Sequence, residues 1–179
     1  MRAPRGEAGF TLVELMLVLT LIGILSAIGV PALRRAQGAA IEVATISSLR
    51  TIHSAQVAFA GACGGGYYAP SIPQLATKPA GSQAAFIGPP FTANSTDRQG
   101  YRIRFTAGTV AAAAPATCNG LAKGRTVPTF FVGADLIVAS PLISRYFGVN
   151  ASGVIYESTK RIAVLQTGVP PAPAKPIGK

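Results

Sequence analysis

The chain has 179 residues, of which 49% are hydrophobic, and its 16 Lys and Arg outnumber six Asp and Glu to give a formal net charge of +10. This length suits one globular domain, and one histidine with six acidic residues leaves little for an acid–base or paired-carboxylate active site. The positive charge favours phosphate, anionic lipid or acidic polysaccharide as partners, but it also serves solubility and does not choose among them.

The chain begins with a short polar segment that leads into a long apolar run. Residues 1–9 contain Arg2 and Arg5 and end at Gly9, and the 24 residues of 10–33 contain one ionisable side chain, Glu14. A helix of that length reaches about 36 Å, enough to cross a hydrocarbon core of about 30 Å. We therefore predict a leader at 1–9 and a transmembrane segment at 10–33.

The run Gly-Phe-Thr-Leu-Val-Glu-Leu-Met at 9–16 resembles the N-terminal signal of type IV pilins and type II secretion pseudopilins. The resemblance implies that prepilin peptidase cuts after Gly9 on the cytoplasmic side and that the new amine of Phe10 is methylated. It also implies that Glu14 pairs with that amine on a neighbouring subunit. Arginines flank the span on both sides, so the orientation, with the body outside the cytoplasm, rests on the resemblance.

The helix is predicted to continue past the apolar run as far as Ala60. Pro31 lacks an N–H and should kink or loosen the helix near Ala27. Beyond it an amphipathic stripe with spacings of three and four predicts a face packed on a globular domain, formed by Ile41, Ala44, Ser48, Ile52, Ala55 and Phe59. Glycines at 61 and 64–66 supply the end of the helix.

The two cysteines, Cys63 and Cys118, fall in the part of the chain expected outside the cytoplasm, where disulfides persist. A bridge between them would close a loop of about 55 residues and stabilise the fold by about 4 kcal/mol. Two buried free thiols are the alternative. A metal site is disfavoured, because the cysteines are far apart in sequence and His53 is the one histidine.

The remainder of the chain predicts a small antiparallel sheet. Residues 67–75 read as a loop leading to a short helix capped by Ser71, and 78–97 as a surface loop. Strands are expected at 100–106, 127–132, 144–149, 154–157 and 161–166, with 134–142 ambiguous and 150–153 forming a hairpin turn. We predict an α+β fold with a globular domain at 34–168, which includes the second half of the helix, and an exposed, flexible Pro-rich tail at 169–179.

The strand at 100–106 alternates apolar and basic side chains. Arg102 and Arg104 share one face, and Arg98 lies nearby in sequence. Such a stripe could grip a phosphate backbone with salt-sensitive affinity, although a solvated sheet face is the ordinary explanation.

The resemblance implies a structural subunit that is inserted in the inner membrane as a single-pass precursor. Prepilin peptidase and inner-membrane assembly machinery would then handle it, yielding an extracellular pilus or a periplasmic pseudopilus. No cofactor is expected, and no metal either: some pseudopilins bind calcium near the C-terminus, but Asp135 and Glu157 are isolated acids here. Two alternatives are a minor pilin that binds DNA during uptake and a membrane-tethered enzyme, for which catalytic groups are lacking.

Overall fold

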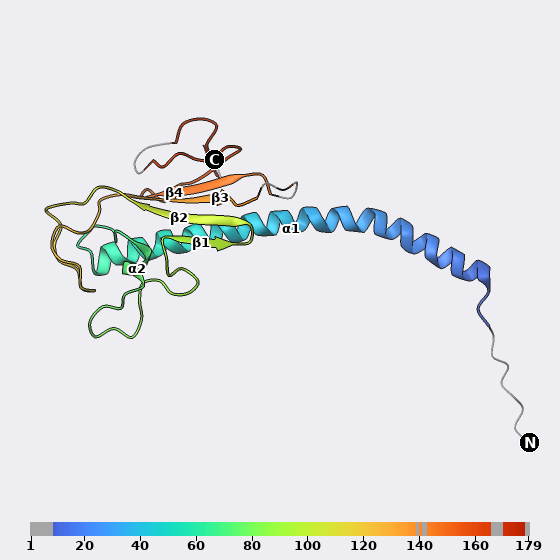
Figure 1. Ribbon diagram of the computed structural model, residues 1–179, viewed down its shortest axis with the longest axis horizontal. Coiled ribbons are helices and arrows are strands. Elements are labelled where there is room, and N and C mark those ends of the chain that lie inside the picture. The colour runs from blue at the N-terminus through green and yellow to red at the C-terminus, as the bar shows by residue number, and fades with distance from the viewer. Residues whose placement is uncertain (1–8, 139, 141–142, 166–169, 178–179) are drawn as a thin grey trace, which may run out of the picture.

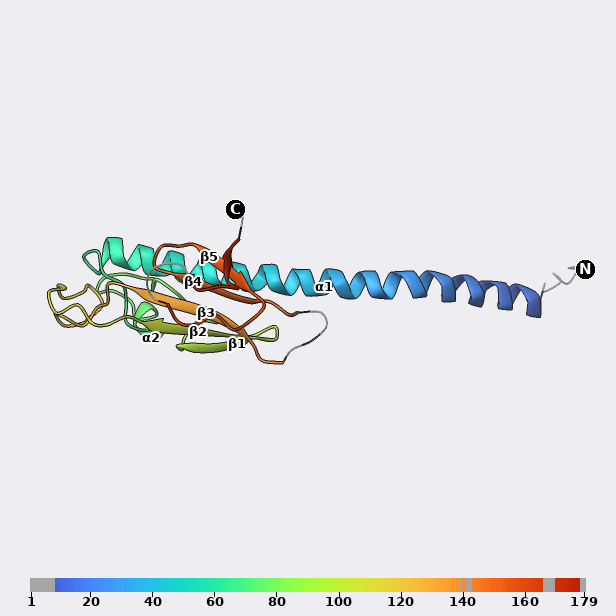
Figure 2. The same ribbon diagram turned by 90° about the horizontal axis from the view of Figure 1, so that it is seen from above.

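A computed structural model describes residues 9–138, 140, 143–165 and 170–177. The fold is α+β, with one long helix, α1 (Leu12–Ala62, 51 residues), lying against an antiparallel sheet (Figures 1 and 2). The C-terminal half of α1 packs on one face of the sheet, while the N-terminal half projects beyond it with its side chains exposed. The predicted fold class is thereby confirmed.

The sheet has six strands in sequential order, and every neighbouring pair is antiparallel. The strands are β1 (Ser95–Arg98), β2 (Tyr101–Ala107), β3 (Phe130–Leu136), β4 (Tyr146–Asn150), β5 (Ile155–Ser158) and β6 (Lys175–Pro176). One further short helix, α2 (Ile72–Leu75), follows α1, and the hydroxyl of Ser71 caps it by accepting from the N–H of Gln74 at 3.3 Å, as the sequence predicted.

Two tight turns set the register of the hairpins. Gln99 and Gly100 both have positive φ and join β1 to β2, the backbone twist that suits a two-residue hairpin. The predicted turn at 150–153 joins β4 to β5, and Asn150 Oδ1 accepts hydrogen bonds from the N–H and hydroxyl of Ser152. Gly153 has φ +79°, a conformation that glycine adopts without strain.

The row of α1 side chains that faces the sheet is not quite the predicted one. The buried positions are centred on Gly38, Glu42, Thr45, Leu49, Ile52, Gln56 and Phe59, whereas Ile41, Ala44 and Ser48 are only partly buried. The apolar pattern placed the stripe to one side because it assumed that polar side chains face water. Glu42 and Gln56 are buried because each has a partner reached across the fold.

The partner of Glu42 is Arg145, which lies just before β4. Arg145 Nε donates to Glu42 Oε2 at 3.1 Å and its Nη1 donates to Glu157 Oε2 at 2.7 Å. Glu157 in turn pairs with Lys175 on β6 at 3.2 Å. This chain of ion pairs ties α1 to the last strands of the sheet, and it places a carboxylate where the sequence pattern predicts solvent.

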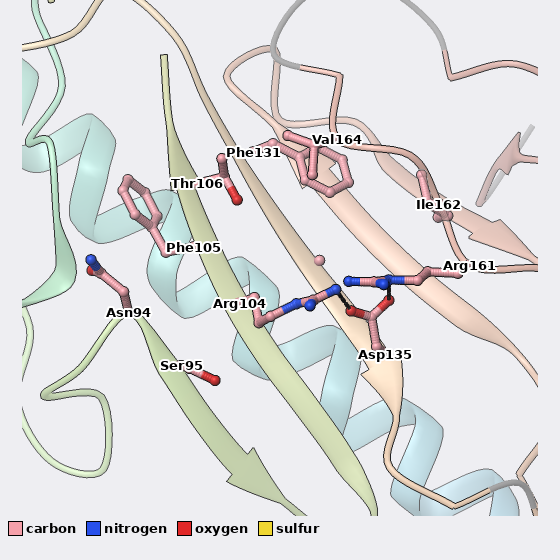
Figure 3. A pocket seen from close by; sticks show the side chains of 11 residues that line it. Asn94, Ser95, Arg104, Phe105, Thr106, Phe131, Asp135, Arg161, Ile162 and Val164 are labelled. Atoms are coloured by element: carbon pink, nitrogen blue, oxygen red, sulfur yellow. Dashed lines mark hydrogen bonds and ion pairs between the residues drawn. The ribbon is translucent and has the colours of Figure 1, made fainter. Parts of the chain in front are cut away.

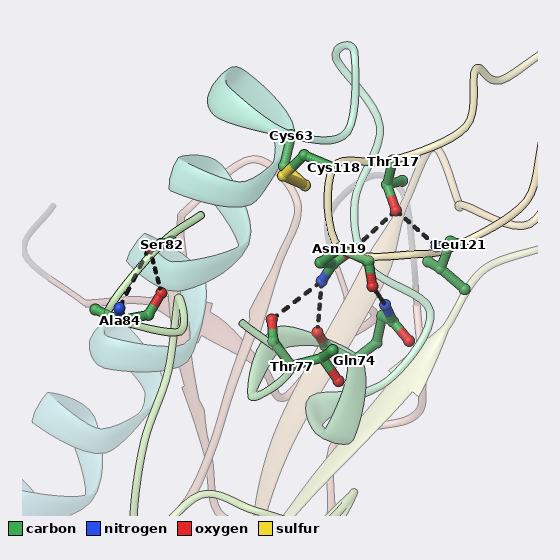
Figure 4. Close-up of a disulfide and its surroundings, with 9 residues drawn as sticks. All are labelled: Cys63, Gln74, Thr77, Ser82, Ala84, Thr117, Cys118, Asn119 and Leu121. Carbon is green, nitrogen blue, oxygen red and sulfur yellow. Dashed lines mark hydrogen bonds between the residues drawn. A yellow bond between two sulfur atoms is a disulfide. The ribbon is translucent and has the colours of Figure 1, made fainter. Parts of the chain in front are cut away.

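The cysteines form the expected disulfide, Cys63–Cys118, with a Cα–Cα distance of 5.0 Å. It fastens the long β2–β3 connection to the C-terminal end of α1 (Figure 4). Next to it the side-chain amide of Asn119 donates to the carbonyl of Gln74 at 2.8 Å, and Gln74 Nε2 donates to the Asn119 carbonyl at 3.1 Å. The bridge and this pair together hold the connection against α2.

Replacing both cysteines by serine is expected to lower the free energy of unfolding by about 4 kcal/mol, because the reduced chain gains the entropy of an open 55-residue loop when it unfolds. Urea unfolding of the detergent-solubilised protein followed by circular dichroism measures the change. Reduction of the wild-type chain should reproduce the same midpoint. A double variant as stable as the oxidised wild type would contradict the expectation.

Several predicted segments differ in the structure. As predicted, α1 continues past Pro31, but it stays helical there, and Figure 1 shows its N-terminal half curving. The predicted surface loop 78–97 contributes strand β1, and both Ile87 and Phe91 are buried in the core. The strand predicted at 127–132 begins at Phe130 and continues to Leu136 as β3. The first residues of the ambiguous stretch 134–142 are therefore part of a strand.

The C-terminal region also differs. Residues 161–165 form no strand, and residue 166 of that prediction lies outside the described residues. The predicted tail is not simply an exposed one: within 170–177, Pro170 is buried and Lys175–Pro176 pair with β5. Proline can join a sheet at its edge because its missing N–H is not needed on the outer side, so proline content alone did not exclude a strand.

Candidate processing and assembly site

The residues of the predicted cleavage motif lie where the chain passes from extended to helical backbone. Gly9 and Phe10 precede α1 and are exposed, with Phe10 at 77%. Thr11 is the N-cap in an extended conformation, and its Oγ1 accepts from the N–H of Glu14 at 3.2 Å. The peptide bond after Gly9 therefore lies in accessible, non-helical backbone, the form in which a protease can approach it.

Glu14 lies in the first turn of α1, next to the positive end of the helix dipole, where a carboxylate is favoured. Thr11 and Glu14 also have the spacing of a capping box, a local signal of the helix start that was not among the sequence predictions. Within the described residues the carboxylate of Glu14 has neither a hydrogen bond nor an ion pair. A partner for it would have to come from outside the described residues.

The surface around Glu14 is apolar on all sides. One described helix, α1, is long and apolar enough to cross a membrane, and none of its most apolar window is buried by the rest of the protein. Most of the large side chains from Leu12 to Leu33 are exposed. A surface of this size is stable only in lipid or against other apolar helices, because each buried CH₂ contributes about 0.8 kcal/mol.

Comparison with protein families decides the nature of this segment. Residues 4–30 match the family model described as the prokaryotic N-terminal methylation motif. The chain carries a prepilin signal. That signal supports a pilin- or pseudopilin-type substrate of prepilin peptidase, and it implies polymerisation with pilin subunits. No curated protein and no solved structure matches the chain.

The prepilin signal and the long apolar helix together fit a membrane-anchored precursor. The signal is consistent with the roles predicted from the sequence. Cleavage after Gly9, methylation of Phe10 and assembly through Glu14 stay predictions. Geometry adds that the first two are accessible and that the third has no partner within the described chain.

Arg102 and Arg104 share one face of β2, as predicted, whereas Arg98 lies on the other face. Residues paired across a sheet share a face, and Arg98 pairs with Tyr101, which is buried on the α1 side. Arg98 lies over the ring of Phe91 at 5.6 Å. It is therefore on the opposite face from Arg102, and the three arginines cannot make one stripe.

The other two arginines are engaged by carboxylates. Arg102 Nε and Nη2 donate to the two oxygens of Asp97 at 2.8 and 2.9 Å, and this hydrogen bonding lowers the pKa of Asp97 below its ordinary value. Arg104 pairs with Asp135. The alternation within β2 correctly predicted that both point outward, and the neighbouring strands place an acid beside each of them. Polyanion binding by this face stays a prediction.

His53, the one histidine, shows no sign of a ligand site. Its ring lies against Phe130, with ring centroids 6.0 Å apart, and its buried Nε2 has no hydrogen-bond partner in the described structure. Among the described residues no group of three or more His, Cys, Asp or Glu is placed to hold a metal ion.

Proposed function

We propose that the protein is a structural subunit, not an enzyme, of a type IV pilus or a type II secretion pseudopilus. The observation that carries this is the prepilin signal continuing into a helix whose N-terminal half is apolar and uncovered. A membrane anchor alone would need about 20 residues, yet α1 runs unbroken from that segment into the core of the globular domain. The helix thus links the domain rigidly to the assembling part.

Assembly proceeds by exchange of one apolar environment for another. In the membrane, lipid covers the N-terminal half of α1, and in the filament the same half of neighbouring copies replaces the lipid. Apolar contact alone would allow many axial offsets between smooth helices. Glu14 selects one of them, because a carboxylate left unpaired among apolar side chains is costly and a charged amine on the neighbouring Phe10 removes that cost.

Cleavage after Gly9 supplies that amine. Before cleavage the nitrogen of Phe10 is an uncharged peptide group, so Glu14 of a neighbour has no cation to meet. Processing therefore acts as the switch from anchored precursor to assembling subunit. The filament then lies outside the inner membrane, as an extracellular pilus or a periplasmic pseudopilus.

Mass spectrometry of the mature protein tests the processing step. The N-terminal peptide is expected to begin at N-methylated Phe10, and a Gly9→Val precursor is expected to stay uncut, because a branched side chain beside the scissile bond hinders access to the backbone. Gly6→Val in the same leader is the matched control and should be processed normally. An intact N-terminus on the wild-type protein taken from its native membrane would overturn the proposal.

A further inference from the structure

The face of the sheet turned away from α1 contains a hollow of about 240 Å³. The segment 159–165 passes over this face, and the hollow lies between that segment and strands β1, β2 and β3 (Figure 3). Its volume is below the roughly 300–1,000 Å³ of pockets that enclose drug-sized ligands. A ligand here would be a small molecule or the end of a chain.

Two arginines and one acid form the polar rim. Arg104 and Arg161 reach from opposite sides to the carboxylate of Asp135, with Arg161 Nε at 3.2 Å from Oδ1 (Figure 3). Arg104 uses Nη2 for this contact and Arg161 uses Nε, so further N–H groups of both guanidiniums remain for a ligand. One carboxylate between two guanidiniums leaves a net charge of +1, and nearby Arg102 adds none because Asp97 neutralises it.

Asp135 also fixes the geometry of the rim. Its side chain is only 15% exposed, whereas those of Arg104 and Arg161 are 38% and 58% exposed. The acid therefore lies below its partners and holds the two planar donors side by side at the surface. Two fixed guanidiniums with one surplus charge are suited to an oxyanion, because arginine donors match carboxylate geometry.

The rest of the hollow is lined by apolar side chains and by the uncharged polar residues Asn94, Ser95 and Thr106. Gly133 on β3 lines it and pairs with Gly148 across the sheet, and the ring of Phe131 occupies the space over both glycines. The ring of Phe131 lies over Gly148, and Ile162 and Val164 from the crossing segment complete the wall (Figure 3). The two glycines thus make room for the Phe131 ring. Phe131 and Ile162 are themselves buried, so Val164 is the exposed apolar side chain of this wall.

We propose that this hollow binds a carboxylate that carries a small apolar group, either a free acid or the C-terminal residue of a polypeptide. The surplus charge of +1 matches a monoanion. The exposed apolar side chain of Val164 favours an organic acid over inorganic phosphate, which is strongly hydrated and would leave Val164 uncovered. This inference goes beyond the assembly function and uses none of the residues assigned to it.

Binding to the full processed chain in detergent micelles tests the proposal, with titrations followed by amide NMR shifts. Acetate, propionate and isovalerate carry the same charge with a growing apolar part, and affinity is expected to rise along this series by about tenfold, with inorganic phosphate weaker than isovalerate. The shifts should centre on Gly133, Asp135 and Arg161. A peptide ending in leucine, compared with its C-terminal amide, distinguishes a polypeptide end from a free acid as the ligand.

Arg161→Gln removes one guanidinium and should weaken isovalerate binding by about tenfold, the scale of one charge-assisted hydrogen bond. Arg50→Gln, an exposed change of the same charge on α1, is the matched control and should bind as wild type does. If Arg161→Gln fails to fold, the location of the wild-type shifts still decides the question. No saturable shifts at these residues, equal binding of phosphate, or equal loss in both variants would overturn the proposal.

Discussion

Replacing Glu14 with alanine is expected to leave the precursor inserted and processed but to reduce its incorporation into filaments by at least about tenfold. The carboxylate has no partner among the described residues of its own chain, so its removal costs the isolated subunit little. In the proposed filament, the change leaves a neighbour's charged Phe10 amine unpaired among apolar side chains. A charge in that setting costs about 2.5 kcal/mol or more, well above the 1.4 kcal/mol that corresponds to tenfold.

The measurement is the ratio of Glu14→Ala to wild-type subunit in sheared filaments when both are co-expressed. Thr20→Ala is the matched control in the same apolar segment. Its hydroxyl donates to the Leu17 carbonyl of its own helix at 2.8 Å, so losing it leaves no group on a neighbour unpaired. Glu14→Gln keeps the shape without the charge and should resemble Glu14→Ala. Incorporation of Glu14→Ala at the wild-type ratio would show that the charge pair does not set the register.

Much of the fold could be predicted from local sequence patterns. The apolar run, the stripe beyond it and the alternation in β2 each depend on residues close in sequence, and each led to the correct element type. The β4–β5 turn was equally readable, because Asn150 and Gly153 are placed as such a turn requires. The Ser71 cap was likewise local.

The features that could not be predicted depend on contacts between residues that are far apart in the sequence. The sequence pattern places Glu42 at the surface, because its partner Arg145 is 103 positions away in the chain. Strand β1 is polar and short, and it is a strand only because β2 accepts it in register. For the candidate site the same limit holds: Gly9, Phe10 and Glu14 form a contiguous motif, whereas the rim of Arg104, Asp135 and Arg161 comes from three separate segments.

Replacing Gln56 is expected to have a large effect on the free energy of unfolding. The apolar pattern of α1 did not predict that this polar side chain is buried. The side chain is fully buried on α1 and pairs with the backbone of Ala69 in both directions. Nε2 donates to the Ala69 carbonyl at 3.0 Å, and Oε1 accepts from the Ala69 N–H at 2.8 Å. Ala69 itself is fully buried, so its N–H and carbonyl lose their hydrogen-bond partner if the amide is removed.

Gln56→Ala is therefore expected to lower the free energy of unfolding by about 3–5 kcal/mol, since each unpaired buried backbone group costs about 1–3 kcal/mol and a cavity adds to the loss. Gln56→Met separates the two causes, because it keeps most of the volume and loses only the hydrogen bonds. Thr51→Ala, on the exposed face, is the control and should change stability by less than about 0.5 kcal/mol. Urea unfolding in detergent, read by circular dichroism, gives all three values. If Gln56→Met were as stable as wild type, apolar packing alone would hold Ala69, and the amide would not be what anchors the segment after α1.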